Sequence, residues 1–132
     1  MDQFNKMLAR WEPMVLSIFR IMVGLLLFQY GVAKILKFPV LPYFVNIPPL
    51  IAVAGWIELV LGALLILGLF TRPVAFILSG FMAAAYFMAH FPMSFFPAIN
   101  MGEAALLYCF IFLYLAAAGP GPWAIDKEGR EG

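Results

Sequence analysis

The residues best suited to chemistry in this sequence are ionisable and amide side chains set within strongly apolar segments. Glu58 is the one charged residue in the apolar run from Ile47 to Phe70. A charge near the middle of a bilayer costs about 2.5–3.5 kcal/mol even on the lenient insertion scale, so its carboxyl group should face protein or trapped water. Gly55 and Gly62 share its helical face, and small residues there let another helix approach closely.

Other polar side chains are expected to meet Glu58 in one half of a helical bundle. They come from the other apolar segments and comprise Gln29, Tyr30, Lys34, His90, Asn100 and Glu103, with Arg20 approaching from the opposite side. Charges inside a bundle must be paired or hydrated. We therefore expect a structural ion pair between Arg20 and Glu58. A second pair would join Lys34 to Glu103, and a swap of Lys34 onto Glu58 is the alternative.

This set of residues could bind a small lipophilic ligand and move protons. Lys34 or His90 would hydrogen-bond a ligand carbonyl, and Glu58 or Glu103 would relay protons. The candidate ligand-binding residues are Gln29, Lys34, Glu58, His90, Asn100 and Glu103. No metal site is expected from a chain with one His and one Cys.

Some of these residues also have purely structural explanations. The Arg20–Glu58 pair could serve only to fix the helix register. Lys34 could extend outward to the lipid headgroups, as long basic side chains do near the ends of membrane helices. Glu103 lies where a helix is expected to begin, and the helix dipole favours a carboxylate there. His90 could be an ordinary interfacial histidine.

Composition indicates which elements position these side chains. The chain has 132 residues, of which 65% are hydrophobic and 11% charged, and its mean hydropathy is +0.99. These values indicate an integral membrane protein, and at about 20 residues a span the length allows four spans in one domain. The net charge of +1 comes without a basic cluster, which argues against nucleic-acid binding. Cys109 is the only cysteine, so no CxxC redox pair exists.

The sequence predicts an all-α membrane protein, a four-helix transmembrane bundle with up-down-up-down topology. An amphipathic helix from Met1 to Glu12 should lie in the membrane interface before it. The predicted spans cover about residues 13–37, 48–70, 73–91 and 99–118. Gly24 and Gly31 share the inward face of the first span with Arg20 and Lys34. The proline-rich loop of residues 38–49 should fold onto the membrane surface.

Basic residues predict the orientation in the membrane. The side that holds both termini has five, namely Lys6, Arg10, Arg72, Lys127 and Arg130, and the opposite side has Lys34 and Lys37. The positive-inside rule therefore predicts that both termini are cytoplasmic.

Several of these segments, taken in order from Arg20 to Asp126, together resemble the DoxX family. The matching elements are Arg20…Gly24…Gly31…Lys34, Gly55-x-x-Glu58, Gly68-Leu69-Phe70-Thr71-Arg72, Ala85-Tyr86-Phe87…His90-Phe91-Pro92, Asn100-Met101-Gly102-Glu103 and Leu113-Tyr114-Leu115-Ala116-Ala117-Ala118-Gly119-Pro120-Gly121. The family is similar to the small membrane subunit of an archaeal thiosulfate:quinone oxidoreductase. The resemblance implies a bacterial or archaeal inner-membrane protein close to quinone-linked redox chemistry.

Three functions are compatible with these features. The first is a quinone-interacting or membrane-anchoring subunit of an oxidoreductase complex, with partner subunits or further copies of the chain in the bilayer. The second is a non-catalytic assembly or scaffold protein whose polar cluster holds the bundle together. The third is a small dimeric proton-coupled transporter in which Glu58 is the coupling carboxyl.

Overall fold

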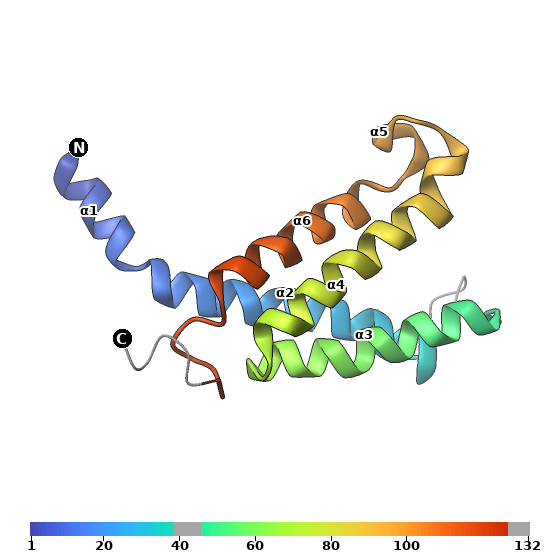
Figure 1. The fold of residues 1–132 in the computed structure, drawn as a ribbon, viewed down its shortest axis with the longest axis horizontal. Coiled ribbons are helices and arrows are strands. Elements are labelled where there is room, and N and C mark those ends of the chain that lie inside the picture. Colours follow the sequence, from blue (N-terminus) through green and yellow to red (C-terminus); the bar gives the residue numbers. More distant parts are fainter. Residues whose placement is uncertain (39–45, 127–132) are drawn as a thin grey trace. The chain divides into compact units, whose positions relative to one another are not determined.

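The computed structural model describes residues 1–38 and 46–126, which are predominantly helical (Figure 1). In chain order the helices are α1 (Asp2–Arg10), α2 (Glu12–Ile35), α3 (Pro49–Leu67), α4 (Thr71–Ala85), α5 (Pro97–Asn100) and α6 (Glu103–Ala118). A π-helical turn (Tyr86–His90) and a 3-10 turn (Phe91–Met93) continue α4. The described residues contain no strand, so the predicted all-α class is confirmed.

Three helical stretches are long and apolar enough to cross a membrane. They are Glu12–Ile35, Pro49–Leu67 and the continuous stretch Thr71–Met93. The fourth, α6, is apolar but has only 16 residues. The chain is therefore a helical membrane protein, and its arrangement as a four-helix bundle remains a prediction.

The chain divides into two compact units. Unit 1 contains residues 1–70 and the segment from Pro120, and unit 2 contains residues 71–119. The prediction of a single domain is untested. The predictions for the loop at residues 38–49 and for Lys127 and Arg130 fall largely or wholly outside the described residues.

In unit 1, α2 packs antiparallel against α3, and glycines bring the two backbones close together (Figure 1). A Cβ atom at Gly31 would lie 2.6 Å from the backbone nitrogen of Leu59, and one at Gly24 would lie 2.9 Å from the Ile66 side chain. Any side chain at Gly31 would force the helices apart, so the predicted glycine contact is confirmed. At the end of α3, Gly68 adopts a left-handed conformation with φ 70°, a common way for a helix to stop.

In unit 2, α4 packs antiparallel against α6. Leu78 on α4 and Phe112 and Leu115 on α6 are fully buried. The hydroxyl group of Ser79 donates a 2.8 Å hydrogen bond to the carbonyl of Cys109. Ser79 thus belongs to the contact between α4 and α6, whereas a Cβ built at Gly80 would meet no other group within 4 Å.

Two predicted helix boundaries need correction. The third span does not end as a regular α-helix, because Tyr86–His90 is a π-helical turn. The fourth helix begins at Glu103 rather than near Ile99, since Met101 interrupts it with a φ of 62°. The N-terminal helix forms as predicted, and Pro13 lies in the first turn of α2.

Candidate functional site

The structure pairs the predicted central acid with a lysine. Lys34 lies in the last turn of α2, and its Nζ atom is 2.6 Å from Oε1 of Glu58 on α3. Only 13% of the lysine side chain and 6% of the glutamate side chain are exposed. Neither charge could be supported alone in such apolar surroundings, so each stabilises the other.

Lys34 reaches into the helix pair rather than out toward the headgroups. A Cβ atom at Gly55 would lie 2.9 Å from Cβ of Lys34, so the lysine backbone is level with Gly55. Its side chain then extends by almost one turn of α3 to Glu58, because Cβ atoms lean toward the N-terminus of their own helix. The missing side chain at Gly55 leaves room for the stem of the lysine. This geometry replaces the alternative in which Lys34 extends to the membrane surface.

The predicted ion pair between Arg20 and Glu58 is wrong. Gly31, not Arg20, is the α2 residue level with Leu59 and hence close to Glu58. Arg20 precedes Gly31 by about 16 Å along the helix axis, which is farther than an arginine side chain extends. The swap of Lys34 onto Glu58, the alternative pairing, is the one that the structure contains.

Arg20 instead fastens the end of α3 to the segment that follows α6. Its side chain is fully buried, and its hydrogen bonds run to backbone carbonyl groups. Nε donates to Leu65 (3.0 Å), Nη2 to Trp123 (2.7 Å) and more weakly to Ile66 (3.4 Å), and Nη1 to Pro120. The last carbonyls of a helix lack partners within the helix, and a cation there also interacts favourably with the helix dipole. Arg20 therefore supplies donors to carbonyls of both segments, and that of Leu65 also accepts the backbone N–H of Gly68.

Gln29 and Tyr30 do not join the ion pair. Both residues are exposed on α2, whereas Gly31 is buried against α3. Within unit 1, the structure brings Lys34 and Glu58 together, and the role of Gln29 in a ligand site remains a prediction.

In unit 2, Asn100 ties together the turn that joins α4 to α6. It is fully buried, and its Nδ2 atom donates to the hydroxyl of Tyr86 (3.0 Å) and to the carbonyl of Ser94 (2.9 Å). Its Oδ1 atom accepts a 2.8 Å bond from the backbone N–H of Gly102. The side chain is thus occupied by structural hydrogen bonds.

His90 is held by the same turn. Its Nδ1 atom lies 3.0 Å from the carbonyl of Asn100, and because a carbonyl can only accept, Nδ1 carries the proton. The neutral ring then presents Nε2 as an acceptor. Glu103 is exposed in the first turn of α6, where the helix dipole favours it.

The structure therefore assembles the candidate residues in two sets. Lys34 and Glu58 belong to unit 1, and His90, Asn100 and Glu103 belong to unit 2. That both sets of residues contact one ligand remains a prediction. The predicted pair of Lys34 with Glu103 is replaced by the pair of Lys34 with Glu58.

Some polar residues were missed by the sequence reasoning. Asp126 accepts a 2.9 Å hydrogen bond from the backbone N–H of Phe70, and Ser17 accepts one from Trp123. Both contacts hold the C-terminal segment against unit 1, and they link residues more than 50 positions apart, so no local pattern could reveal them. In unit 2, Arg72 donates to the carbonyls of Ala116 and Ala117. The position of Arg72 at the start of α4 does not indicate these partners at the end of α6.

No other feature of the described residues competes with these sets. Within residues 1–38 and 46–126, no group of three or more His, Cys, Asp or Glu side chains is placed to hold a metal ion. A shallow groove of about 440 Å³ lies where α1 meets α2 and is lined by Met7, Arg10, Trp11 and Met14.

Apolar helices of membrane-spanning length, with a shielded ion pair between two of them, define a polytopic helical membrane protein. Comparison with known proteins is more specific, since residues 15–91 match the DoxX family. The chain belongs to that family. It is also 45% identical over 127 residues to an "Uncharacterized protein" of Haemophilus influenzae, a match that covers 92% of this chain and 95% of the relative. No solved structure matches the chain significantly.

Proposed function

We propose that this protein binds a quinone headgroup and serves as a membrane subunit of an oxidoreductase. The observation that carries the proposal is the Lys34–Glu58 pair, with its 2.6 Å contact shielded inside an apolar helix pair. An ammonium group has three N–H donors, so it can serve a carboxylate and a ligand carbonyl at once. Intramembrane ionisable residues mark functional sites by default.

In the proposed chemistry, the side chains hydrogen-bond the quinone and transfer protons to it. A quinone takes up two electrons and two protons to become a quinol. Lys34 would hydrogen-bond one carbonyl oxygen, and Glu58 would pass protons to it. The electrons would come from a redox group on a partner subunit.

In unit 2, His90 and Glu103 are the candidates for polar contacts with such a ligand. His90 presents an acceptor at Nε2 when neutral and a donor when protonated, so it could bind either form of the headgroup. Glu103 would be a second proton carrier. Membership in the DoxX family supports this proposal through the resemblance to the small subunit of a quinone-reducing enzyme.

Ligand-dependent thermal stability tests the proposal. Decylubiquinone and menadione would be added to the purified protein in detergent, and the melting temperature followed. A bound ligand at about 100 times its Kd adds about 2.7 kcal/mol of stability. We expect a shift for the wild-type protein and for Lys6→Met, a matched lysine removal on exposed α1, but a much smaller shift for Lys34→Met. Failure of both quinones to bind the wild-type protein would overturn the proposal.

A second function, a non-catalytic assembly or anchoring role, is favoured because the buried basic side chains of unit 1 already have partners within the protein. Arg20 is bonded to carbonyl groups and Lys34 to Glu58, so both basic groups have structural partners inside unit 1. In that case Glu58→Gln would lower accumulation of the protein in membranes without a separate loss of activity. A pulldown from native membranes would identify the partner subunits on which either function depends. Transport by a coupling carboxyl would require Glu58 to leave Lys34 in every cycle, and no observation favours it.

A further inference from the structure

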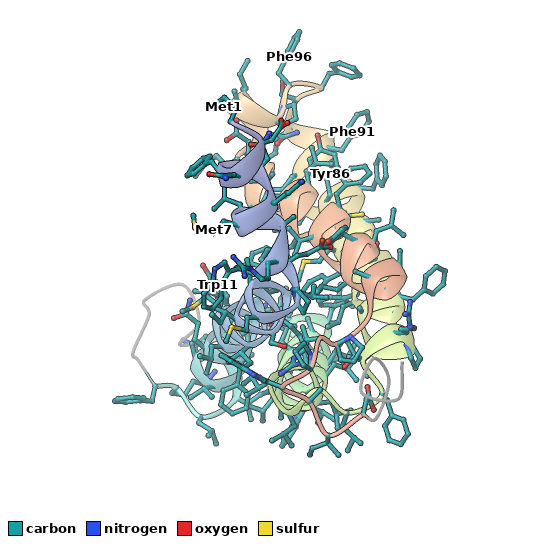
Figure 2. All side chains as sticks on the ribbon, turned by 90° about the vertical axis from the view of Figure 1, so that its left-hand side faces the viewer. Met1, Met7, Trp11, Tyr86, Phe91 and Phe96 are labelled. Carbon is teal, nitrogen blue, oxygen red and sulfur yellow. The ribbon has the colours of Figure 1, made fainter. Side chains whose placement is uncertain are left out.

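The turn between α4 and α6 exposes a dense group of apolar side chains. Residues 91–102 include no charged residue. The exposed large side chains are Phe91 (40%), Met93 (66%), Phe95 (72%), Phe96 (61%), Ile99 (65%) and Met101 (77%). Figure 2 shows Tyr86, Phe91 and Phe96 one after another toward the tip of this turn. An apolar surface of this density marks an interaction site.

Helix length places this turn relative to a bilayer. With 16 residues, α6 is about 24 Å long, whereas the hydrocarbon core of a bilayer is about 30 Å thick. Arg72 donates to the carbonyls of Ala116 and Ala117, so a basic group marks the end of α6 that belongs at a membrane surface. The other end of α6, at Glu103, then stops about 6 Å short of the opposite boundary. Residues 91–102 would fill that remainder up to the boundary that the longer stretch Thr71–Met93 reaches, and the Glu103 carboxylate would face the headgroups rather than the acyl chains.

Part of the backbone of the turn is hydrogen-bonded within the turn itself. Irregular backbone at membrane depth is tolerated only where its polar groups are satisfied by protein. Pro92 and Pro97 have no N–H group to satisfy. Five further N–H groups donate within the turn, those of Ser94, Phe96, Ile99, Asn100 and Gly102.

The side chain of Asn100 hydrogen-bonds polar groups that water would bind in an aqueous loop. It is fully buried, it holds the carbonyl of Ser94 and the N–H of Gly102, and it binds the hydroxyl of Tyr86. The carbonyl of Asn100 in turn receives Nδ1–H of His90. One amide thereby satisfies polar groups from three parts of the turn.

We propose that residues 91–102 form a lipid-embedded turn, whose partner is the hydrocarbon of the bilayer rather than water or another protein. Its phenylalanine and methionine side chains contact acyl chains and complete the membrane crossing that α6 is too short to make. This placement is independent of the proposed quinone chemistry.

Spin labelling of the purified protein alone in dioleoylphosphatidylcholine vesicles tests the placement. A nitroxide would be attached to Phe96→Cys in a Cys109→Ala background, and its collisions with oxygen and with a water-soluble nickel chelate measured. Phe76→Cys, on the 65% exposed side chain within α4, is the lipid-facing control, and Asp2→Cys is the water-facing control. Phe95→Cys repeats the measurement at a neighbouring site if Phe96→Cys folds poorly.

We expect the Phe96 label to resemble the Phe76 label, with an oxygen-to-nickel collision ratio several-fold above that of the Asp2 label. In vesicles of shorter acyl chains the Phe96 label should become accessible to nickel, while the Phe76 label should not, because a thinner bilayer uncovers the turn first. Nickel access in both bilayers would overturn the proposal in favour of an aqueous loop. Protection from both reagents would overturn it in favour of a second copy of the chain covering the turn.

Discussion

Replacing Arg20 by lysine keeps the charge but removes the donors that join α3 to the C-terminal segment. A guanidinium group presents five N–H donors in a fixed planar fork, whereas an ammonium group is a compact point charge on a flexible stem. Arg20 spans carbonyls of two separate segments, at Leu65 and at Trp123. Three separate nitrogen atoms of Arg20 contact Leu65, Pro120 and Trp123, and the single nitrogen of a lysine cannot occupy all three positions.

The size of the effect follows from the contacts. A hydrogen bond from a charged group contributes about 1.5–3 kcal/mol, and a buried acceptor left without its donor costs a comparable amount. Arg20 makes bonds of ordinary length or shorter to Leu65, Trp123 and Pro120, and lysine can retain one of them. Allowing for relaxation of the surrounding chain, we expect Arg20→Lys to lower the free energy of unfolding by about 3 kcal/mol.

Denaturant unfolding in mild detergent, combined with limited proteolysis of the C-terminal segment, would measure this loss. Arg72→Lys is the matched control, because Arg72 also donates to carbonyls at a helix end but is exposed. We expect it to cost less than about 1 kcal/mol, since a lysine can interact with the same helix end from the surface. Equal losses of unfolding free energy for the two variants, with no increase in proteolysis for Arg20→Lys, would refute the claim that Arg20 joins α3 to the C-terminal segment.

Two further predictions concern the helix contacts of each unit. Gly31→Ala should cost about 1–3 kcal/mol, because its Cβ would meet the backbone of Leu59 at 2.6 Å. Gly80→Ala should be neutral or gain up to about 1 kcal/mol from helix propensity, since the site is open, and SDS titration of both variants would show the difference. Asn100→Ala should lower the free energy of unfolding by about 1–3 kcal/mol, because it leaves polar groups unpaired. Deuterium exchange should then rise in residues 91–102. Unchanged exchange would contradict the role of Asn100.

Local patterns in the sequence predict the helices of this protein well. Proline marks the start of α2 and of α3, and glycine marks the end of α3. The spacing of Gly24, Gly31, Gly55 and Gly62 predicts the close contact between the two helices. The π-helical turn was not predictable in this way, because Tyr86–His90 continues the apolar pattern of α4 without an obvious break. Its first and last residues, Tyr86 and His90, contact Asn100 in the turn that follows, and no local pattern announces those contacts.

The candidate site was only partly predictable for a related reason. The sequence indicates that Glu58 needs a basic partner, but which one depends on the offset between two antiparallel helices. An error of a few residues in that offset shifts a contact by several ångströms. Arg20 shows a second limit, because its partners are backbone carbonyls, and the sequence carries no marker for those.

A double-mutant cycle on Lys34 and Glu58 tests the central claim most directly, using the free energy of unfolding in detergent micelles or vesicles. Lys34→Met and Glu58→Gln each leave one buried group without its partner and should each cost about 3–5 kcal/mol. The double variant should cost far less than the sum of the two, because neither charge remains. Additive losses would contradict the account, because they would mean that these two side chains do not depend on each other.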